Sequence, residues 1–121
     1  MYVLPQEIEV WYIIPAIRKE FAKQFVKEHK LSYEKAGNIL GISKAAVSQY
    51  ISNKRANKFT LPEAIKKEIQ KSSKVIAKDH KQAVFEILRI LDIIKKKKYA
   101  CGVCRRYNPE IKQYCDCNPF C

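Results

Sequence analysis

The sequence has 121 residues, of which 24 are Lys or Arg and 12 are Asp or Glu, so the formal net charge is +12. This length suits one domain, or a small domain with an appendage, and disfavours a large enzyme with a deep pocket. The excess of positive charge implies an acidic partner, and nucleic acid is the commonest one.

No apolar run approaches the roughly 18 residues that are needed to cross a bilayer. Residues 1–7 lack the features of a secretory signal. We therefore expect a cytoplasmic protein without a membrane partner. All five cysteines lie in the last 21 residues, and we expect three regions: a DNA-binding region over 1–60, a helical dimerisation region over 61–98, and a metal-binding tail over 99–121.

The N-terminal part predicts at least one helix. From Pro15 onward, apolar residues recur at helical spacing at Ile17, Phe21 and Phe25. Proline suits a first helical turn and biases the residue before it away from a helix. Residues 7–14 are compatible either with a strand or with a helix that joins the next one at a kink. No alternating strand pattern occurs elsewhere, so the sequence predicts an all-α protein.

Two short helices are expected next, over residues 32–40 and 43–51. Ser32 is placed to cap the first, and Gly41 ends it at a turn that needs a residue tolerant of positive φ. Because two such helices cross at a steep angle, a small residue is needed where they touch, and Gly37 supplies it. The apolar residues expected to hold the pair together are Ile39, Leu40, Ile42, Val47 and Tyr50.

The remaining face of the second helix is small or polar and carries no acid. Glutamine reads adenine, serine reads several base edges, and alanine meets the methyl group of thymine. Basic residues that can neutralise phosphates follow the helix directly. The predicted DNA-binding residues are Ser43, Lys44, Ala45, Ser48, Gln49, Asn53, Lys54 and Arg55. A generic helical hairpin with solvated polar faces is the alternative.

Residues 31–51, LSYEKAGNILGISKAAVSQYI, resemble the helix-turn-helix of lambda-repressor-like (XRE-type) regulators. The preceding stretch, residues 10–18, is similar to a group of such regulators found largely in archaea. The resemblance covers residues 1–55 well and the rest in outline, and it implies a sequence-specific transcription regulator. Gly37 departs from the family, in which most members carry Ala, and glycine is expected to loosen the first helix by about 1 kcal/mol.

A longer helix is expected from Thr60, with Glu63 completing a capping box, to about residue 77. Its inward residues are expected to be Leu61, Ile65, Ile69 and Ile76.

The last helix, over residues 79–94, has more apolar surface than one contact face needs. Nine of the twelve residues in 83–94 are apolar, whereas a surface helix requires one apolar stripe. The second face predicts a homodimer, because helix-turn-helix proteins commonly bind paired half-sites. A central helix in a monomeric core is the alternative. The predicted interface uses part of the set Val84, Ile87, Leu88, Leu91 and Ile94.

The tail is too short and too poor in aliphatic residues to bury a core, so it needs a bound metal or disulfide cross-links to hold a fold. Its candidate metal ligands are Cys101, Cys104, Cys115, Cys117 and Cys121. Disulfides are disfavoured in a reducing compartment, and thiolates suit zinc or iron–sulfur clusters. We favour an iron–sulfur cluster, because Cys115 and Cys117 are too close for a standard zinc knuckle and a fifth cysteine allows ligand exchange. Structural zinc is the alternative, followed by disulfides or free thiols.

Together these features predict an all-α, lambda-repressor-like helix-turn-helix bundle with a long dimerisation helix and a cysteine-rich tail. The expected function is that of a dimeric DNA-binding regulator, not an enzyme, whose iron–sulfur cluster senses redox, oxygen or iron state. The alternatives are a regulator with purely structural zinc, and a small iron–sulfur enzyme or electron carrier.

Overall fold

The structure, a computed structural model, describes residues 4–56, 59–97 and 99. Every regular element in this part of the chain is helical, which confirms the predicted all-α class. None of the described helices is both long and apolar enough to cross a membrane. In chain order the elements are α1 (Pro5–Ile8), η1 (Glu9–Ile13), α2 (Ile14–Lys23), η2 (Gln24–Glu28), α3 (Tyr33–Leu40), α4 (Lys44–Ile51), α5 (Glu63–Lys78), η3 (His80–Gln82) and α6 (Ala83–Lys96).

The first four elements join end to end, so the ambiguous segment 7–14 is helical. Ile14 has helical angles, φ −61° and ψ −45°, although it precedes Pro15. The turn before the proline is π-helical, and the Ile14 N–H donates to the carbonyl of Glu9. A wider turn at this point accommodates the proline ring and its missing N–H without ending the helix.

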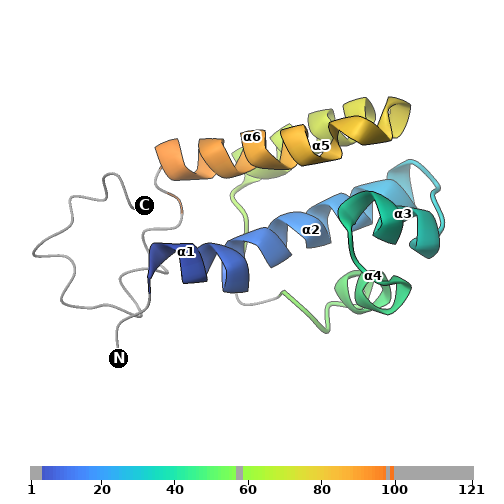
Figure 1. Cartoon of the computed structure of the whole chain (residues 1–121), viewed down its shortest axis with the longest axis horizontal. Helices are drawn as coiled ribbons and strands as arrows, with labels where there is room; N and C mark the ends of the chain where they lie inside the picture. Colours follow the sequence, from blue (N-terminus) through green and yellow to red (C-terminus); the bar gives the residue numbers. More distant parts are fainter. Residues whose placement is uncertain (1–3, 57–58, 98, 100–121) are drawn as a thin grey trace, which may run out of the picture.

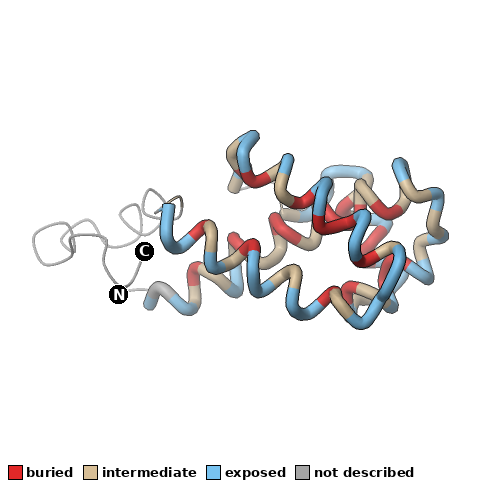
Figure 2. Tube along the Cα trace, turned by 90° about the horizontal axis from the view of Figure 1, so that it is seen from above, coloured by how far each residue is buried: buried red, intermediate tan, exposed pale blue. Residues whose placement is uncertain are grey.

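Helix α2 is the centre of the bundle. It contacts α3 and α4 as well as α5 and α6, and Figure 1 shows the α5–α6 pair on one side of it and α4 on the other. Buried residues alternate with half-buried ones along α2, and Figure 2 shows this kind of alternation along the helical trace. The rings of Phe21 and Phe25 stack with centroids 5.8 Å apart. The buried apolar residues of this central segment are Ile13, Ala16, Ile17, Phe21, Ala22 and Phe25.

Helix α5 begins later than its capping signal predicts. The N-cap position belongs to Pro62, which has an extended ψ of 153° and makes no side-chain capping bond. The prediction that Thr60 caps this helix is therefore wrong, because the extended ψ at Pro62 moves the first helical residue to Glu63. The inward-facing set is confirmed, since Leu61, Ile65, Ile69 and Ile76 are all buried.

Helix α6 buries one of its two apolar faces. Ile90 and Ile94 are buried in the core, so Ile94 is not available for the predicted dimer interface. Val84, Phe85 and Leu88 remain exposed, with 64%, 67% and 56% of their surfaces accessible. The structure thus separates a core face of α6 from an exposed apolar face, which is formed by Val84, Phe85 and Leu88. The sequence pattern alone does not distinguish the two faces.

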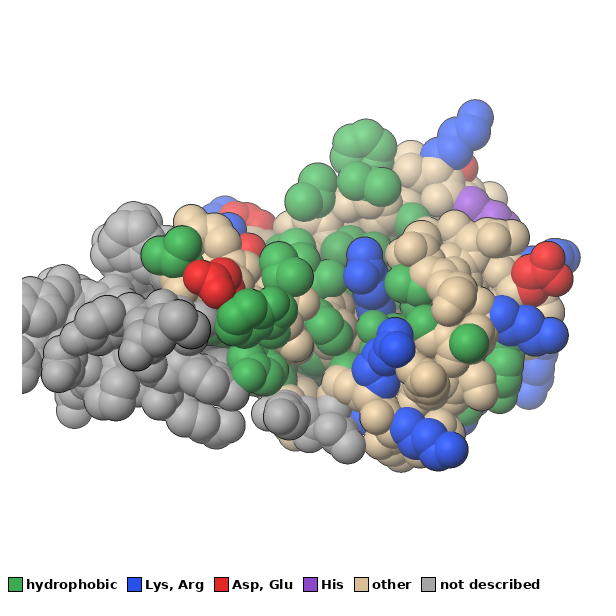
Figure 3. All heavy atoms as spheres, turned by 60° about the horizontal axis from the view of Figure 1, so that its bottom comes forward, with side chains coloured by type: hydrophobic (Ala, Val, Ile, Leu, Met, Phe, Trp, Pro, Cys, Tyr) green, Lys and Arg blue, Asp and Glu red, His purple; other side chains and the backbone are tan. Residues whose placement is uncertain are grey.

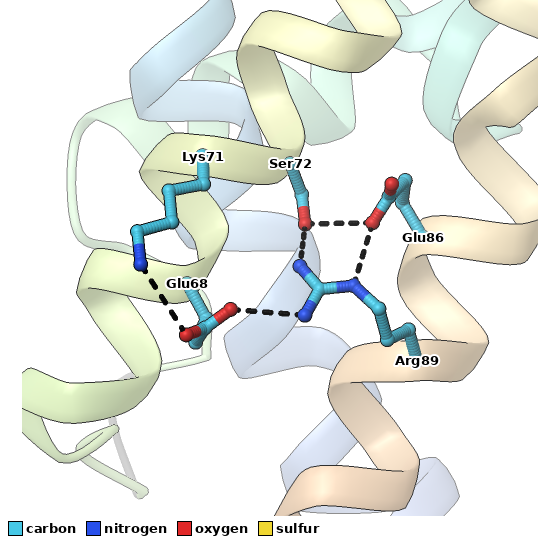
Figure 4. A network of polar contacts seen from close by, with 5 residues as sticks. All are labelled: Glu68, Lys71, Ser72, Glu86 and Arg89. Carbon is cyan, nitrogen blue, oxygen red and sulfur yellow. Dashed lines mark hydrogen bonds and ion pairs between the residues drawn. The ribbon is translucent and has the colours of Figure 1, made fainter.

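An arginine-centred network joins α5 to α6 (Figure 4). Arg89 donates from Nε to Glu86 Oε2 and from Nη1 to Glu68 Oε2, at 2.9 Å in each case. Its Nη2 donates to the hydroxyl of Ser72, which is buried and itself donates to Glu86 Oε2 at 2.9 Å. Hydrogen bonds from Arg89 are the main cause that lowers the pKa of both Glu68 and Glu86 below the usual glutamate value.

Arg89→Met, which keeps aliphatic volume but removes the guanidinium, should lower the free energy of unfolding at neutral pH by about 1–2 kcal/mol. Ser72, Glu68 and Glu86 each lose the donor that Arg89 supplies, although Glu86 keeps the Ser72 hydroxyl. Water screens the Arg89 side chain, which is 42% exposed. Because the glutamate pKa values are lowered, the network stabilises the fold above pH 4.5 and loses this effect as the pH falls through the lower native values. Urea unfolding across this range should show the difference between wild type and variant shrinking in acid. A difference that is independent of pH would show that Arg89 acts by packing alone.

Candidate nucleic-acid interface

The corner between α3 and α4 is built from backbone contacts. Gly41 has a left-handed φ of 70°, and the N–H of Ile42 donates to the carbonyl of Gly37 at 2.9 Å. A Cβ added at Gly37 would lie 2.6 Å from the carbonyl oxygen of Ile42. Glycine at position 37 therefore permits a close approach of α3 to the turn, which a methyl group would prevent.

Both helices of this pair begin at a serine cap. The hydroxyl of Ser32 accepts from the N–H of Lys35 at 3.1 Å, and the hydroxyl of Ser43 accepts from the N–H of Ala46 at 3.0 Å. The predicted cap at Ser32 is confirmed. Ser43 is exposed, and its hydroxyl keeps its own hydrogen available for a ligand while it caps α4.

Helix α4 has a clear inner and outer face. Val47 and Tyr50 are buried against the core, as expected for the anchors of this helix. Lys44, Ala45 and Ser48 are fully on the outer face. Gln49 is half-buried, so it lies at the edge of the outer face rather than at its centre.

The end of α4 fixes the position of two basic residues. Asn53 adopts a left-handed φ of 61°, and its N–H donates to the Tyr50 carbonyl at 3.2 Å. The N–H of Lys54 donates to the Gln49 carbonyl at 2.9 Å. This pair of bonds is the Schellman arrangement, for which Asn is the commonest residue after Gly. These two bonds order the backbone from which the Lys54 and Arg55 side chains project. The guanidinium of Arg55 also lies 5.8 Å from the centre of the Tyr50 ring.

The segment of chain that contains α4 carries positive charge and no acid. No Asp or Glu occurs between residues 35 and 62. Among the described residues, no ion pair involves Lys44, Lys54 or Arg55. Figure 3 shows Lys and Arg side chains spread over the face that carries α4. The arrangement can therefore attract a polyanion, with small and polar side chains between the cations.

Sequence reasoning missed an aromatic groove beside these cations. A hollow of about 400 Å³ is lined by Trp11, Tyr50, Lys54 and Arg55, together with Tyr12, Pro15, Ala56 and Phe59. The signal was present, since residues 10 and 11 fall on the outer side of a helix that buries Ile8 and Ile13. Reading residues 7–14 as a possible strand hid that periodicity.

The five predicted metal ligands, Cys101, Cys104, Cys115, Cys117 and Cys121, lie outside the described residues. Within residues 4–56, 59–97 and 99, no cluster of three or more His, Cys, Asp or Glu side chains is placed to hold a metal ion.

No protein-family model, curated protein or solved structure matches this chain. The case for a function therefore rests on the residues and their geometry.

Gly37→Ala should lower the free energy of unfolding by about 1–3 kcal/mol, because the new methyl group meets a backbone oxygen that cannot easily move. This effect opposes helix propensity, which favours alanine over glycine by about 1 kcal/mol. Asn38→Ala is the matched control, since Asn38 is exposed on the same helix and gains propensity without a clash. Urea unfolding of the three proteins provides the measurement. A Gly37→Ala protein as stable as Asn38→Ala would contradict the close approach.

Proposed function

We propose that the chain is a sequence-specific DNA-binding transcription regulator in which α3 and α4 form a lambda-repressor-like helix-turn-helix. The single observation that carries this proposal is the outer face of α4, which has no acidic residue and is followed by Lys54 and Arg55. The close approach of α3 and the turn at Gly37 holds this helix in place. An α-helix of this kind fits the major groove of duplex DNA. Lys44, Ala45 and Ser48 would meet base edges, and Gln49 would reach them from the edge of the same face.

Lys54 and Arg55 are suited to phosphate contacts because their backbone is already ordered by the cap at the end of α4. Little conformational freedom then remains to be lost when DNA binds. The stacking of Arg55 on Tyr50 adds to this order. Phosphate contacts set the orientation of the protein on the duplex, whereas the outer face of α4 supplies the sequence preference.

Lys54→Ala should weaken binding to all duplexes alike and reduce the slope of log affinity against log salt by about one, because one phosphate contact is lost. Lys74→Ala is the matched control, since Lys74 is also exposed but lies on α5, away from α4 (Figure 1). Binding sites would first be selected from a random duplex pool, and affinities then measured by fluorescence anisotropy over a range of salt. The proposal fails if no duplex is enriched, or if both variants keep the wild-type slope.

Gln49→Ala should instead change the preference for one base, at a loss of about 1–3 kcal/mol at that position. Measuring the variant against a panel of single-base changes in the selected site tests this role. An unchanged ranking of the panel would assign Gln49 to packing, which its half-buried position also allows.

The exposed apolar face of α6 supports a second part of the proposal, a two-fold homodimer. Val84, Phe85 and Leu88 are more than half exposed. Val84 and Leu88 also line a groove of about 360 Å³, to which Ile87 and Leu91 contribute. Exposed apolar side chains that line such a groove can pair with a copy of themselves about a two-fold axis. Paired recognition helices would then read two half-sites.

Leu88→Lys should convert the dimer to a monomer and weaken binding to a paired site, because a charge would enter the apolar contact. Val75→Lys is the control, since Val75 is an exposed apolar residue on α5. Leu91 and Ile94 are unsuitable for this test because both contribute to the packing of the monomer. Sedimentation velocity at micromolar concentration measures the change. A wild-type protein that sediments as a monomer would contradict the dimer.

The cysteine tail supports a sensory role only through its sequence. Five closely spaced thiols suit an iron–sulfur cluster, with structural zinc as the alternative. Iron, sulfide and zinc analysis of protein purified without oxygen separates these possibilities. A colourless zinc protein would leave a DNA-binding regulator without a redox sensor.

A further inference from the structure

One end of the molecule carries apolar side chains that the described residues leave uncovered. Leu4, Val10 and Trp11 have 61%, 58% and 52% of their surfaces exposed, and we call these three residues the N-terminal strip. Figure 3 shows hydrophobic side chains gathered at the end of the molecule where α1 lies. An aromatic and two aliphatic side chains together on a basic protein indicate a contact surface.

The chain leaves the described structure beside this strip. Lys95 at the end of α6 forms an ion pair with Glu9 of η1, with Nζ and Oε1 3.0 Å apart. The N–H of Tyr99 donates to the Ile94 carbonyl at 3.1 Å, and the Tyr99 side chain packs on the core. Figure 1 accordingly shows the last turns of α6 and α1 at the same end of the molecule. Tyr99, the last described residue, therefore lies at the end of the molecule that carries the N-terminal strip.

Residues 100–121 are also a suitable occupant by composition. They contain the apolar residues Val103, Ile111 and Phe120, and the aromatic residues Tyr107 and Tyr114, among the five cysteines. A segment of this length cannot bury such residues against one another in a core of its own. The exposed face of α6 is a poorer destination, because Phe85 lies in its first turn, about 20 Å along the helix from the point of exit.

We propose that the cysteine-bearing tail, residues 100–121, docks on the N-terminal strip formed by Leu4, Val10 and Trp11. Trp11 also lines the groove that contains Tyr50, Lys54 and Arg55. A tail docked on Trp11 therefore borders the basic residues that follow α4. Under the proposed function, this contact is a route by which the state of the cysteines reaches the phosphate-binding residues.

Trp11 is the only tryptophan of the chain, so its fluorescence reports directly on the strip. The experiment compares the full-length protein with the full-length double variant Ile111→Asp, Phe120→Asp, without DNA and in the state in which the protein is isolated. Docking predicts that the variant shifts the Trp11 emission to longer wavelength and raises its quenching by acrylamide. Circular dichroism of both proteins establishes that the helical bundle is retained.

The reciprocal experiment follows the tail from the other side. Val10→Asp should increase the rate at which a thiol reagent labels the tail cysteines, because the tail loses part of its docking surface. Val75→Asp is the matched control, since Val75 is also an exposed valine, at 43% against 58%, but lies on α5, outside the N-terminal strip and the proposed dimer contact. It should leave the labelling rate at the wild-type value.

The proposal is overturned if the tail variant leaves Trp11 emission and quenching unchanged, or if Val10→Asp and Val75→Asp label at the same rate. Trp11 shielding that depends on protein concentration would also overturn it, because a second copy would then cover the strip. Neither experiment uses DNA, so docking and DNA binding can fail independently.

Discussion

Helix α2 must satisfy packing partners on more than one side, and the other elements are arranged around that requirement. The α3–α4 pair and the α5–α6 pair both contact it. Ile17, Phe21 and Phe25 have no exposed surface, and deleting one buried phenylalanine side chain typically costs about 3–5 kcal/mol. A protein of this size has few residues of that kind, so the two helix pairs share a single core. The surface proposed for DNA binding therefore depends on the same residues that hold the rest of the bundle.

The geometry of the α3–α4 pair is set mainly by the backbone. Its caps, the left-handed turn at Gly41 and the close approach at Gly37 involve main-chain atoms or short serine side chains. The side chains on the outer face of α4 are consequently not needed to hold the two helices together. They can therefore be selected for contact with a ligand. Backbone hydrogen bonds also position Lys54 and Arg55, because the cap at Asn53 orders their backbone before any ligand binds. Their side chains are therefore available for contact with a ligand.

In the part of the chain that the structure describes, the two exposed apolar surfaces discussed above lie near opposite ends of α6. Val84 and Phe85 belong to its first turn, whereas the N-terminal strip is near its last, where Lys95 pairs with Glu9. A dimer contact at one end and a docked tail at the other would not compete for the same surface. Helix α6 connects the two surfaces, and the hydrogen bonds of Arg89 to Glu68 and Ser72 hold this helix against α5.

The sequence by itself determined the helical class, the start of α3 and α4 and the inward face of α5. These properties follow from local signals, since Ser32, Ser43 and Gly41 act through hydrogen bonds within a few residues and burial repeats with the helical period. It also located the basic residues after α4, but not the aromatic groove beside them. Only the tertiary structure decided that Pro15 lies within a continuous helix, that Gly37 is required by an approaching carbonyl, and that Ile94 faces inward while Leu88 faces outward. A helix with two apolar faces has no sequence signal that selects one of them, because that choice depends on which neighbouring helices bury it.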